Sequence, residues 1–347
     1  MADDRLTLEV DDAGPDPARR LAESLGTRVG LVGVLDRLDR SARPVRAAGG
    51  AAGGAGSSVL AWDRRDSWTR TWWPQGITCW ADGAAVRSSL GLGERRVLLA
   101  AWYARAARAV GAGHTATRVS VLDLDVCPPR YAHVELVQPD VDGGHGAGVR
   151  PVRMHAGGLA WCGSLLLVAD TRRGVRVFDL ADVVRTKRPR GVTHLLPQRA
   201  AWRAGALDGS RPLRWSFLSL DRTEPTRLWL VAGEYARGGT GARLARWPLD
   251  PCTGAPTASS PVEVLHPGIR SMQGAVRVEG RYVVSASRGR RRRGDLWTST
   301  TDGGWVRHLE VLPVGPEDLA YDPGTRLLWT QTEHPRRRAV LSLPLPI

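Results

Sequence analysis

One phrase recurs five times along this chain and limits its fold more than any other feature. It consists of a turn-rich stretch, a short strand that opens on a polar residue, a second apolar strand that ends on a polar or acidic residue, and a third strand. The openings lie at residues 73–77, 155–159, 216–220, 272–276 and 316–320. Their spacing falls from about 80 residues to about 45, a drift that propeller blades with variable loops tolerate. The sequence therefore predicts an all-β fold, a five-bladed β-propeller.

The last repeat runs out of chain after its third strand. We expect the strand at residues 58–62 to supply the missing outer strand, so that an N-terminal strand closes the last blade. Closure of this kind removes the unpaired strand edges that an open sheet exposes. The propeller is thus expected to span residues 58–347.

Two segments precede the expected propeller. Residues 1–48 form an expected N-terminal helical appendage, because the pattern from residue 16 to about residue 39 places apolar side chains on one side. Residues 49–57 are rich in glycine and alanine, a composition typical of a flexible linker. Residues 139–153 and 186–212 are expected to be variable loops that set ligand specificity.

The net charge of +14 does not by itself indicate a nucleic-acid partner. Lys187 is the only lysine among the 49 basic residues, and this excess of arginine, with abundant Ala, Gly and Pro, is typical of high-GC coding. The arginines are scattered, whereas nucleic-acid binding favours a basic face. The exception is the run of arginines at residues 290–293, which is either a solvated hairpin loop or a phosphate-binding patch. We expect a small-molecule substrate, no nucleic acid or membrane as partner, and a monomer or homodimer.

Cysteine spacing and the N-terminus bear on metal binding and location. The four cysteines, Cys79, Cys127, Cys162 and Cys252, include no Cys-x-x-Cys pair, so a zinc site is not expected. The first residues lack the basic and apolar regions of a signal peptide, and no apolar run reaches the roughly 18 residues that span a membrane. The chain is therefore predicted to be cytoplasmic. No cofactor is expected, although carboxylates could hold a divalent cation such as calcium.

The polar strand openings and the ends of the second strands should meet at one mouth of the central channel. In an antiparallel sheet the start of one strand lies beside the end of the next, and a concave mouth with converging polar groups is the usual ligand site. Carboxylates that are close together or partly buried have raised pKa values, which suits general acid catalysis. The expected catalytic residues are Glu317, Asp318, His155, Asp170 and Glu234.

His155 precedes Gly157 and Gly158, where a close backbone approach is expected. The tryptophans near the first opening could line an apolar pocket or stack on a cation. Any single polar residue at a strand start could instead only satisfy backbone groups. The expected substrate-binding residues are Trp72, Trp73, Gln75, Trp102, Tyr103, Ser219, Gln273, Ser287, Arg288 and Glu333.

Several of these phrases, taken in order, resemble those of a family of actinobacterial β-propeller proteins that are mostly uncharacterised and often secreted. The resemblance lies in residues 72–78, 155–158, 165–171, 272–275 and 316–319 and covers about residues 58–345. It implies the fold and not a reaction. The architecture is also loosely similar to gluconolactonase and strictosidine-synthase-like propellers, whose functional residues have no position-by-position match here.

Three functions remain open at this level. The resemblance, with no recognisable export signal, favours a cofactor-independent tailoring enzyme of bacterial specialised (secondary) metabolism: a cyclase, isomerase or lyase with a largely apolar substrate. In that case Glu317, Asp318 or His155 would move a proton or polarise a carbonyl. The alternatives are a non-catalytic propeller that binds a small molecule or glycan, and a metal-assisted lactone or ester hydrolase.

Overall fold

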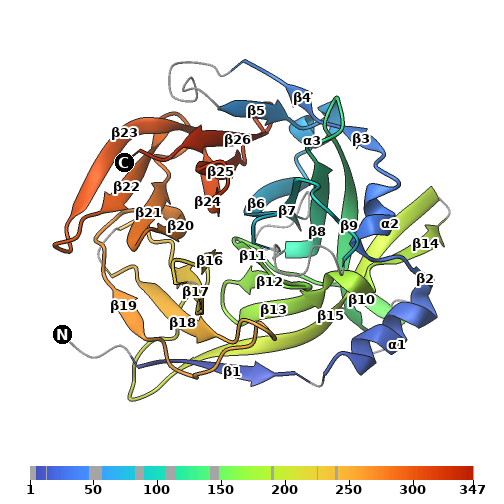
Figure 1. The fold of residues 1–347 in the computed structure, drawn as a ribbon, viewed down its shortest axis with the longest axis horizontal. Coiled ribbons are helices and arrows are strands. Elements are labelled where there is room, and N and C mark those ends of the chain that lie inside the picture. Colours follow the sequence, from blue (N-terminus) through green and yellow to red (C-terminus); the bar gives the residue numbers. More distant parts are fainter. Residues whose placement is uncertain are drawn as a thin grey trace.

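The computed structural model describes residues 5–12, 14–46, 57–82, 90–105, 114–140, 148–188, 191–224, 226–238 and 241–346. The fold is mostly β with few helices, and its sheets surround a common axis as blades do in a β-propeller (Figure 1). Most of the expected Gly/Ala-rich linker, residues 49–56, lies outside the described residues.

The first two series of antiparallel strands belong to one sheet. Strand β15 runs parallel to β9 and thereby joins them. The first series is β6 (Trp72–Cys79), β7 (Val97–Arg105), β8 (His114–Asp123) and β9 (Arg130–Pro139). The second series is β11 (Leu159–Cys162), β12 (Leu165–Asp170), β13 (Gly174–Asp179) and β15 (Gly191–Ala206).

The remaining strands form three separate antiparallel sheets. The first contains β16 (Phe217–Asp221), β17 (Leu228–Gly233), β18 (Leu244–Leu249) and β19 (Glu263–Leu265). The second contains β20 (Met272–Val278), β21 (Arg281–Ala286), β22 (Arg293–Ser299) and β23 (Trp305–Val314). The third contains β24 (Pro316–Asp322), β25 (Leu327–Thr332), β26 (Ala339–Pro344), β5 (Ser58–Ala61) and β4 (Arg43–Pro44).

The predicted closure between the two ends of the chain is present. Strand β5 pairs antiparallel with β26, with Leu60 opposite Val340, and the backbone amide of Ser58 donates to Ser342 Oγ at 3.0 Å. Strand β26 therefore has neighbours on both sides, and the edge that the C-terminal repeat would otherwise expose is covered.

The N-terminal segment contains strands as well as helices. Helix α1 (Asp16–Leu25) and helix α2 (Gly30–Leu35) replace the single expected helical pattern. Gly26 lies at the break, where a Cβ would be 2.5 Å from the carbonyl oxygen of Arg185. Strand β1 (Leu6–Asp11) pairs with β15, and short strands β2 (Thr27–Arg28) and β3 (Arg40–Ser41) pair with β14 and β9. The described part of this segment thus adds strands to the outside of the sheets, which helical periodicity could not predict.

The expectation of a variable loop at residues 186–212 is wrong for most of that range. Strand β14 (Val184–Arg188) and the long strand β15 form a hairpin there, and β15 continues along β13. Its apolar side chains Leu195, Leu196, Ala200 and Trp202 are buried. The segment stays extended because β15 pairs with both β13 and β9 and buries its apolar side chains there. The local turn residues do not reveal this pairing.

Three further elements complete the described chain. They are β10 (Val149–Pro151), the short helix α3 (Arg64–Trp68) and the 3₁₀ helix η2 (Leu180–Asp182). Asp63 caps α3, because its Oδ1 accepts the backbone N–H of Asp66 at 2.8 Å. Helix α3 lies directly before β6 and so borders the start of the first series of strands.

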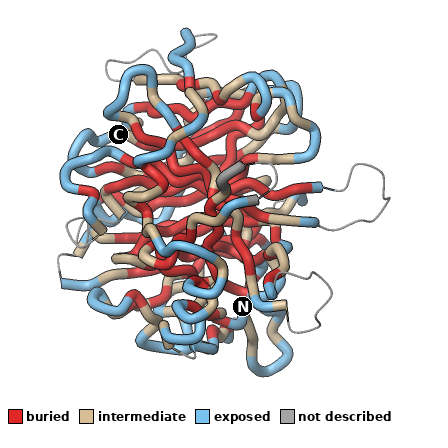
Figure 2. The backbone as a smooth tube through the Cα atoms, turned by 90° about the vertical axis from the view of Figure 1, so that its right-hand side faces the viewer, coloured by how far each residue is buried: buried red, intermediate tan, exposed pale blue. Residues whose placement is uncertain are grey.

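The inner strands approach one another at the axis, where glycines make the approach possible. A Cβ at Gly158 would lie 2.0 Å from the backbone nitrogen of Leu218, and one at Gly274 would lie 2.5 Å from that of Leu319. A Cβ at Gly157 would lie 2.1 Å from the carbonyl oxygen of Ser216, so the close approach expected after His155 is confirmed. Figure 2 shows the buried residues concentrated in the interior of the molecule and the exposed ones in the turns at its periphery.

Candidate functional site

Two glutamates lie close together where the inner strand β24 opens and β25 ends. Glu317 is 3% exposed, and Gln273 Nε2 donates to its Oε1 at 3.4 Å. Burial raises the pKa of Glu317 well above its usual range, and the neighbouring Glu333 and Asp318 carboxylates raise it further. Burial also raises the pKa of Glu333, against the lowering charges of Arg290, Arg338 and Arg105. Glu317, Glu333 and Gln273, all expected at one mouth, are thus brought together.

Tyr103, His155 and a second histidine form an aromatic cluster beside these acids. The rings of Tyr103 and His155 stack with centroids 4.8 Å apart, and His114 contacts both rings. Burial lowers the pKa of His155 to about 3, and the positive charges of His114 and Arg105 lower it further. His155 is therefore neutral near pH 7, and burial raises the pKa of Tyr103. Near neutral pH, His155 can accept a proton only weakly.

A hollow of about 500 Å³ opens beside Glu333 and His334. It is lined by Arg70, Trp73, Arg290, Arg291, His334, Pro335 and Arg337. We call it the mouth hollow. The guanidinium of Arg105 lies 5.6 Å from the Trp73 ring, and that of Arg338 lies 5.2 Å from it, each measured to the ring centroid. The arrangement places an indole and several cations near the partly exposed Glu333 and its buried neighbour Glu317.

Asp318 connects three inner strands through hydrogen bonds to backbone amides. Its side chain is fully buried, and Oδ2 accepts the backbone N–H groups of Ile77 and Leu159, each at 3.1 Å. Burial raises its pKa well above the usual value, and these two hydrogen bonds oppose the rise. The carboxyl thus links β24 to β6 and β11, which is the backbone-satisfying role that polar residues at strand starts can have.

Glu234 and Asp170 are held by arginines. Glu234 is 2% exposed, and Arg243 donates to both of its carboxylate oxygens at 2.9 and 3.1 Å, while Arg211 donates to it at 3.1 Å. Although burial raises the pKa of Glu234, the hydrogen bond from Arg243 reverses the shift and lowers it. Asp170 accepts from Arg176 Nε at 3.0 Å. Neither carboxylate lines the mouth hollow.

Four expected substrate-binding residues also have structural contacts. Gln75 Nε2 donates to the carbonyl of Pro74, and Ser219 Oγ donates to that of Ala275. Trp102 is fully buried, and its Nε1 donates to Ser120 Oγ at 2.8 Å. The guanidinium of Arg118 lies 4.3 Å from the ring centroid of Trp72 and 5.1 Å from that of Trp102. None of these four side chains lines the mouth hollow.

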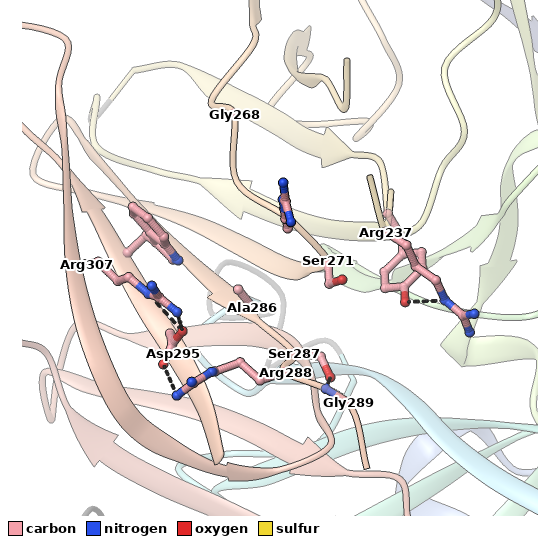
Figure 3. Close-up of a pocket in the computed structure, with 12 residues that line it drawn as sticks. Arg237, Gly268, Ser271, Ala286, Ser287, Arg288, Gly289, Asp295 and Arg307 are labelled. Carbon is pink, nitrogen blue, oxygen red and sulfur yellow. Dashed lines mark hydrogen bonds and ion pairs between the residues drawn. The ribbon is translucent and has the colours of Figure 1, made fainter. Parts of the chain in front are cut away.

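Ser287 and Arg288 line a different cavity, of about 670 Å³, where β21 ends (Figure 3). Arg288 is paired there with Glu310 at 2.8 Å, and Asp295 pairs with Arg307 at 2.6 Å. Ser287 Oγ accepts the backbone amide of Gly289 at 3.2 Å. The expected substrate-binding residues therefore do not share one cavity: Trp73 lines the mouth hollow, Ser287 and Arg288 line this other cavity, and the others line neither. The second strands of neighbouring sheets end at separate points around the ring.

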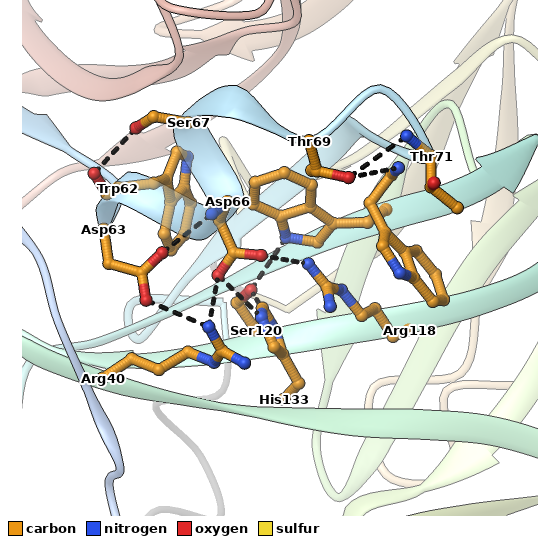
Figure 4. Close-up of polar contacts among 12 residues, drawn as sticks. Arg40, Trp62, Asp63, Asp66, Ser67, Thr69, Thr71, Arg118, Ser120 and His133 are labelled. Atoms are coloured by element: carbon orange, nitrogen blue, oxygen red, sulfur yellow. Dashed lines mark hydrogen bonds and ion pairs between the residues drawn. The ribbon is translucent and has the colours of Figure 1, made fainter.

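The sequence reasoning missed a buried polar network centred on Asp66 (Figure 4). Asp66 accepts from Arg118 Nη2 at 2.5 Å, Tyr131 OH at 2.7 Å, His133 Nε2 at 2.9 Å and Arg40 Nη1 at 3.4 Å. Burial alone raises the pKa of Asp66, but the hydrogen bond from His133 and the charge of Arg118 lower it far below its usual range.

His133 in turn lies 3.0 Å from Ser120 Oγ through its Nδ1. Burial lowers the pKa of His133 to about 4, so the neutral ring that donates from Nε2 and accepts at Nδ1 fits both contacts. Ser120 is fully buried, so this serine, histidine and aspartate form a structural chain and not an accessible nucleophile. These residues come from three separated segments without a shared motif, so no local signal in the sequence pointed to them.

Sequence reasoning also missed several side chains at the mouth. Arg70, His114 and Arg337 belong to no repeated phrase, and Arg290 and Arg291 were interpreted either as a solvated loop or as a phosphate patch. Within the described ranges, no group of three His, Cys, Asp or Glu side chains is placed to hold a metal ion. Likewise, no helix in the described part of the chain is long and apolar enough to cross a membrane.

The buried acid pair predicts a pH-dependent stability. A carboxyl whose pKa is raised on folding stabilises the fold fully below its unfolded pKa, and this contribution is lost as pH rises through the folded pKa. For Glu317 that loss begins above the reference value of 4.5. Glu317→Gln cannot ionise, so between about pH 5 and about pH 8 it should lose less unfolding free energy than the wild type, by about 1 kcal/mol or more.

Urea unfolding at both pH values measures this difference. Glu9→Gln, at an exposed position of β1, is the matched control and should follow the wild type at both pH values. Equal pH dependence in wild type and Glu317→Gln would contradict the burial argument.

Comparison with known proteins gives no family. No protein-family model and no curated protein sequence matches the chain. Among solved structures, an endo-arabinase from Bacteroides thetaiotaomicron VPI-5482 is 11% identical, with a TM-score of 0.43, over 81% of this chain and 96% of that chain. The RS223 β-xylosidase is 10% identical, with a TM-score of 0.40, over 78% and 91%.

The β-propeller domain of Cps50 (Swd1) from Myceliophteria thermophila is 11% identical, with a TM-score of 0.37, over 80% of this chain and 98% of that chain. Likenesses with such low scores carry no argument about what this chain does. The resemblance to an actinobacterial family stays a prediction. The candidate site therefore stands on its own geometry.

Proposed function

We propose that this chain binds a small anionic ligand of carbohydrate type in the mouth hollow. The observation that carries the proposal is the lining itself: an indole, four arginines and a histidine around about 500 Å³, next to the partly exposed Glu333 and its buried neighbour Glu317. Ligand pockets commonly enclose about 300 to 1,000 Å³ and place a few polar groups against an apolar surface. This proposal corresponds to the glycan-binding alternative that the sequence left open, and the charge of the lining restricts the ligand to an anion.

The roles of the lining residues follow from their chemistry. Trp73 offers a ring face on which an apolar sugar face can stack. Arg290 and Arg291 can form charge-assisted, two-pronged hydrogen bonds to a carboxylate or phosphate. Glu333, whose pKa is raised, lies 3.4 Å from Nδ1 of the lining residue His334 and can hold that ring in place at the wall of the hollow. Glu317 is 3% exposed and does not itself line the hollow.

Removal of two lining arginines should weaken the binding of anionic sugars more than the binding of a neutral sugar. Isothermal titration compares glucuronate, glucose 6-phosphate and glucose on the full chain. We expect the two anions to bind more tightly than glucose, and R290A/R291A to weaken their binding by about tenfold to a hundredfold, since hydrogen bonds to charged groups contribute about 1.5 to 3 kcal/mol. R20A/R227A removes the same charge from exposed positions of α1 and the turn before β17 and is the matched control.

Equal affinity for glucose and glucuronate, with no effect of R290A/R291A, would contradict the proposal.

The second candidate function is a cofactor-independent cyclase, isomerase or lyase in which Glu317 moves a proton. It can be tested by proton NMR of the same protein–ligand mixtures in D₂O. The raised pKa of Glu317 is the observation that favours it. Deuterium incorporation that Glu317→Gln abolishes, with binding retained, would favour the enzyme, and binding without chemical change would favour the binding module.

We also propose that each antiparallel series is one blade, with four strands in the first four series and β4 added at the edge of the last, so that the propeller has five blades. The strand orders support this count, since each series begins at one of the five polar openings or directly after it. The radial arrangement then explains why residues from β6, β21 to β22 and β25 to β26 border one hollow although some 260 positions separate them.

A further inference from the structure

We propose that a second cavity, which shares only Arg337 with the mouth hollow, binds a single-chain amphiphilic anion such as an alkyl carboxylate. The cavity encloses about 590 Å³. Its walls come from β4, β5 and β26 on one side and from the end of β23 on the other, and α3 borders it. We call it the interblade groove. It lies between the outer strands of two sheets that are neighbours in Figure 1.

The walls of the groove are apolar, and part of them faces solvent. Val45 is 44% exposed and Trp68 is 51% exposed, two of the most exposed large apolar side chains among the described residues. They continue the surface formed by Val59, Val311, Val314 and Leu341. A contiguous apolar surface with a polar rim typically marks an interaction site. A linear alkyl chain that packs against this wall is removed from water, which favours binding.

The rim carries charge of one sign. Seven arginines line the groove, and among its described lining residues none is acidic. Some are already engaged: Arg338 Nη1 donates to the carbonyl of Asp66 at 2.8 Å, and the guanidinium of Arg336 lies 4.5 Å from the Trp68 ring centroid. By contrast Arg43, Arg46 and Arg64 form no ion pair with any described residue. They are therefore the groups that can receive an anionic head.

Both properties together define the ligand class. A valine-lined wall needs an apolar partner, and a rim with only positive charge needs an anion, for which a carboxylate is the planar match to a guanidinium. A small, strongly hydrated anion would leave the apolar wall in water, and an uncharged alkane would leave the arginines without a counter-charge. A volume of about 590 Å³ lies in the range of small-molecule sites, about 300 to 1,000 Å³, so the occupant is a small molecule and not a folded domain.

The test is titration of the full chain with dodecanoate below its micelle concentration, followed by calorimetry. Saturable binding is expected, decanoate should bind about tenfold more weakly because two methylenes are lost, and 1-dodecanol should bind at least about tenfold more weakly because it has no charge. Val45→Asp and Arg64→Glu should each weaken binding by about tenfold or more. Both positions are exposed, so each variant should fold.

Matched controls separate a specific site from non-specific uptake. Val262→Asp replaces a valine that is 53% exposed near β19, and Arg227→Glu reverses a charge near β17, so both should bind dodecanoate within about twofold of the wild type. Glucuronate binding should be the same in Val45→Asp and wild type, which keeps this result independent of the mouth hollow. Equal loss in the controls, no preference for dodecanoate over 1-dodecanol, or binding of an acidic valine-rich peptide without binding of dodecanoate would overturn the proposal.

Discussion

Replacing Asp66 with alanine is expected to lower the free energy of unfolding by about 3 to 5 kcal/mol, because removal of one partner from a buried ion pair leaves the other charge uncompensated. Asp66 is 3% exposed, and two arginines, a tyrosine and a histidine donate to it. Without the carboxylate, Arg118 remains buried beside the rings of Trp72 and Trp102 and loses the ion pair that balances its charge.

Chemical denaturation of wild type and Asp66→Ala measures the loss. Asp11→Ala is the control, since Asp11 also pairs with an arginine, Arg203 at 2.6 Å, but both side chains are more than half exposed. An exposed pair contributes about 1 kcal/mol or less, so the control should change little. A similar small effect in both variants would show that the Asp66 network does not hold α3 against β8 and β9.

Gly158→Ala should destabilise the protein by about 3 kcal/mol or more, the upper end of what overpacking of a core costs. The added Cβ would lie 2.0 Å from the backbone nitrogen of Leu218 and 2.4 Å from the carbonyl carbon of Phe217. Backbone atoms cannot rotate away as a side chain can, so β11 and β16 would have to separate. The hydrogen bond from the Leu159 amide to Asp318 would be disturbed by the same shift.

Thermal and urea unfolding of Gly158→Ala test this expectation. Gly238→Ala is the matched control, because a Cβ there meets no atom within 4 Å. If both variants were as stable as the wild type, the inner strands would not approach as closely as the structure shows. If Gly158→Ala fails to fold, its recovery in the soluble fraction relative to Gly238→Ala gives the same comparison.

The repeated phrase was sufficient to predict the strands and the closure of the ring. Hairpin residues and apolar runs are local signals, and the run at residues 97–104 is apolar throughout because β7 is buried on both faces. The closing strand at residues 58–61 was predictable because the last repeat lacked one. The long hairpin of β14 and β15 was not, since its extended form depends on burial against two sheets that are distant in the sequence.

The candidate site could be predicted only in part for the same reason. Glu317, Glu333, Gln273, Tyr103 and His155 lie together because the openings and strand ends share one end of the ring. Glu234 follows the end of a second strand and Asp318 lies in a strand opening, and both were expected to face the mouth; yet an arginine pair holds Glu234 and two backbone amides hold Asp318. Which carboxylate has a hydrogen-bond or ion-pair partner depends on groups from other strands, and the position within the repeat does not predict it.

The amino-acid sequence by itself determined most of the strand order, the glycines at the axis and some of the polar residues near the mouth, because these depend on local periodicity and on the lack of a side chain at the closest approach. Only the tertiary structure decided which of those polar groups already bind a protein partner and where the arginines gather. It also decided that Asp66 has four side-chain donors from three distant segments. Hydrogen bonds and ion pairs need atoms within about 3 Å, and that proximity is a property of the packed sheets.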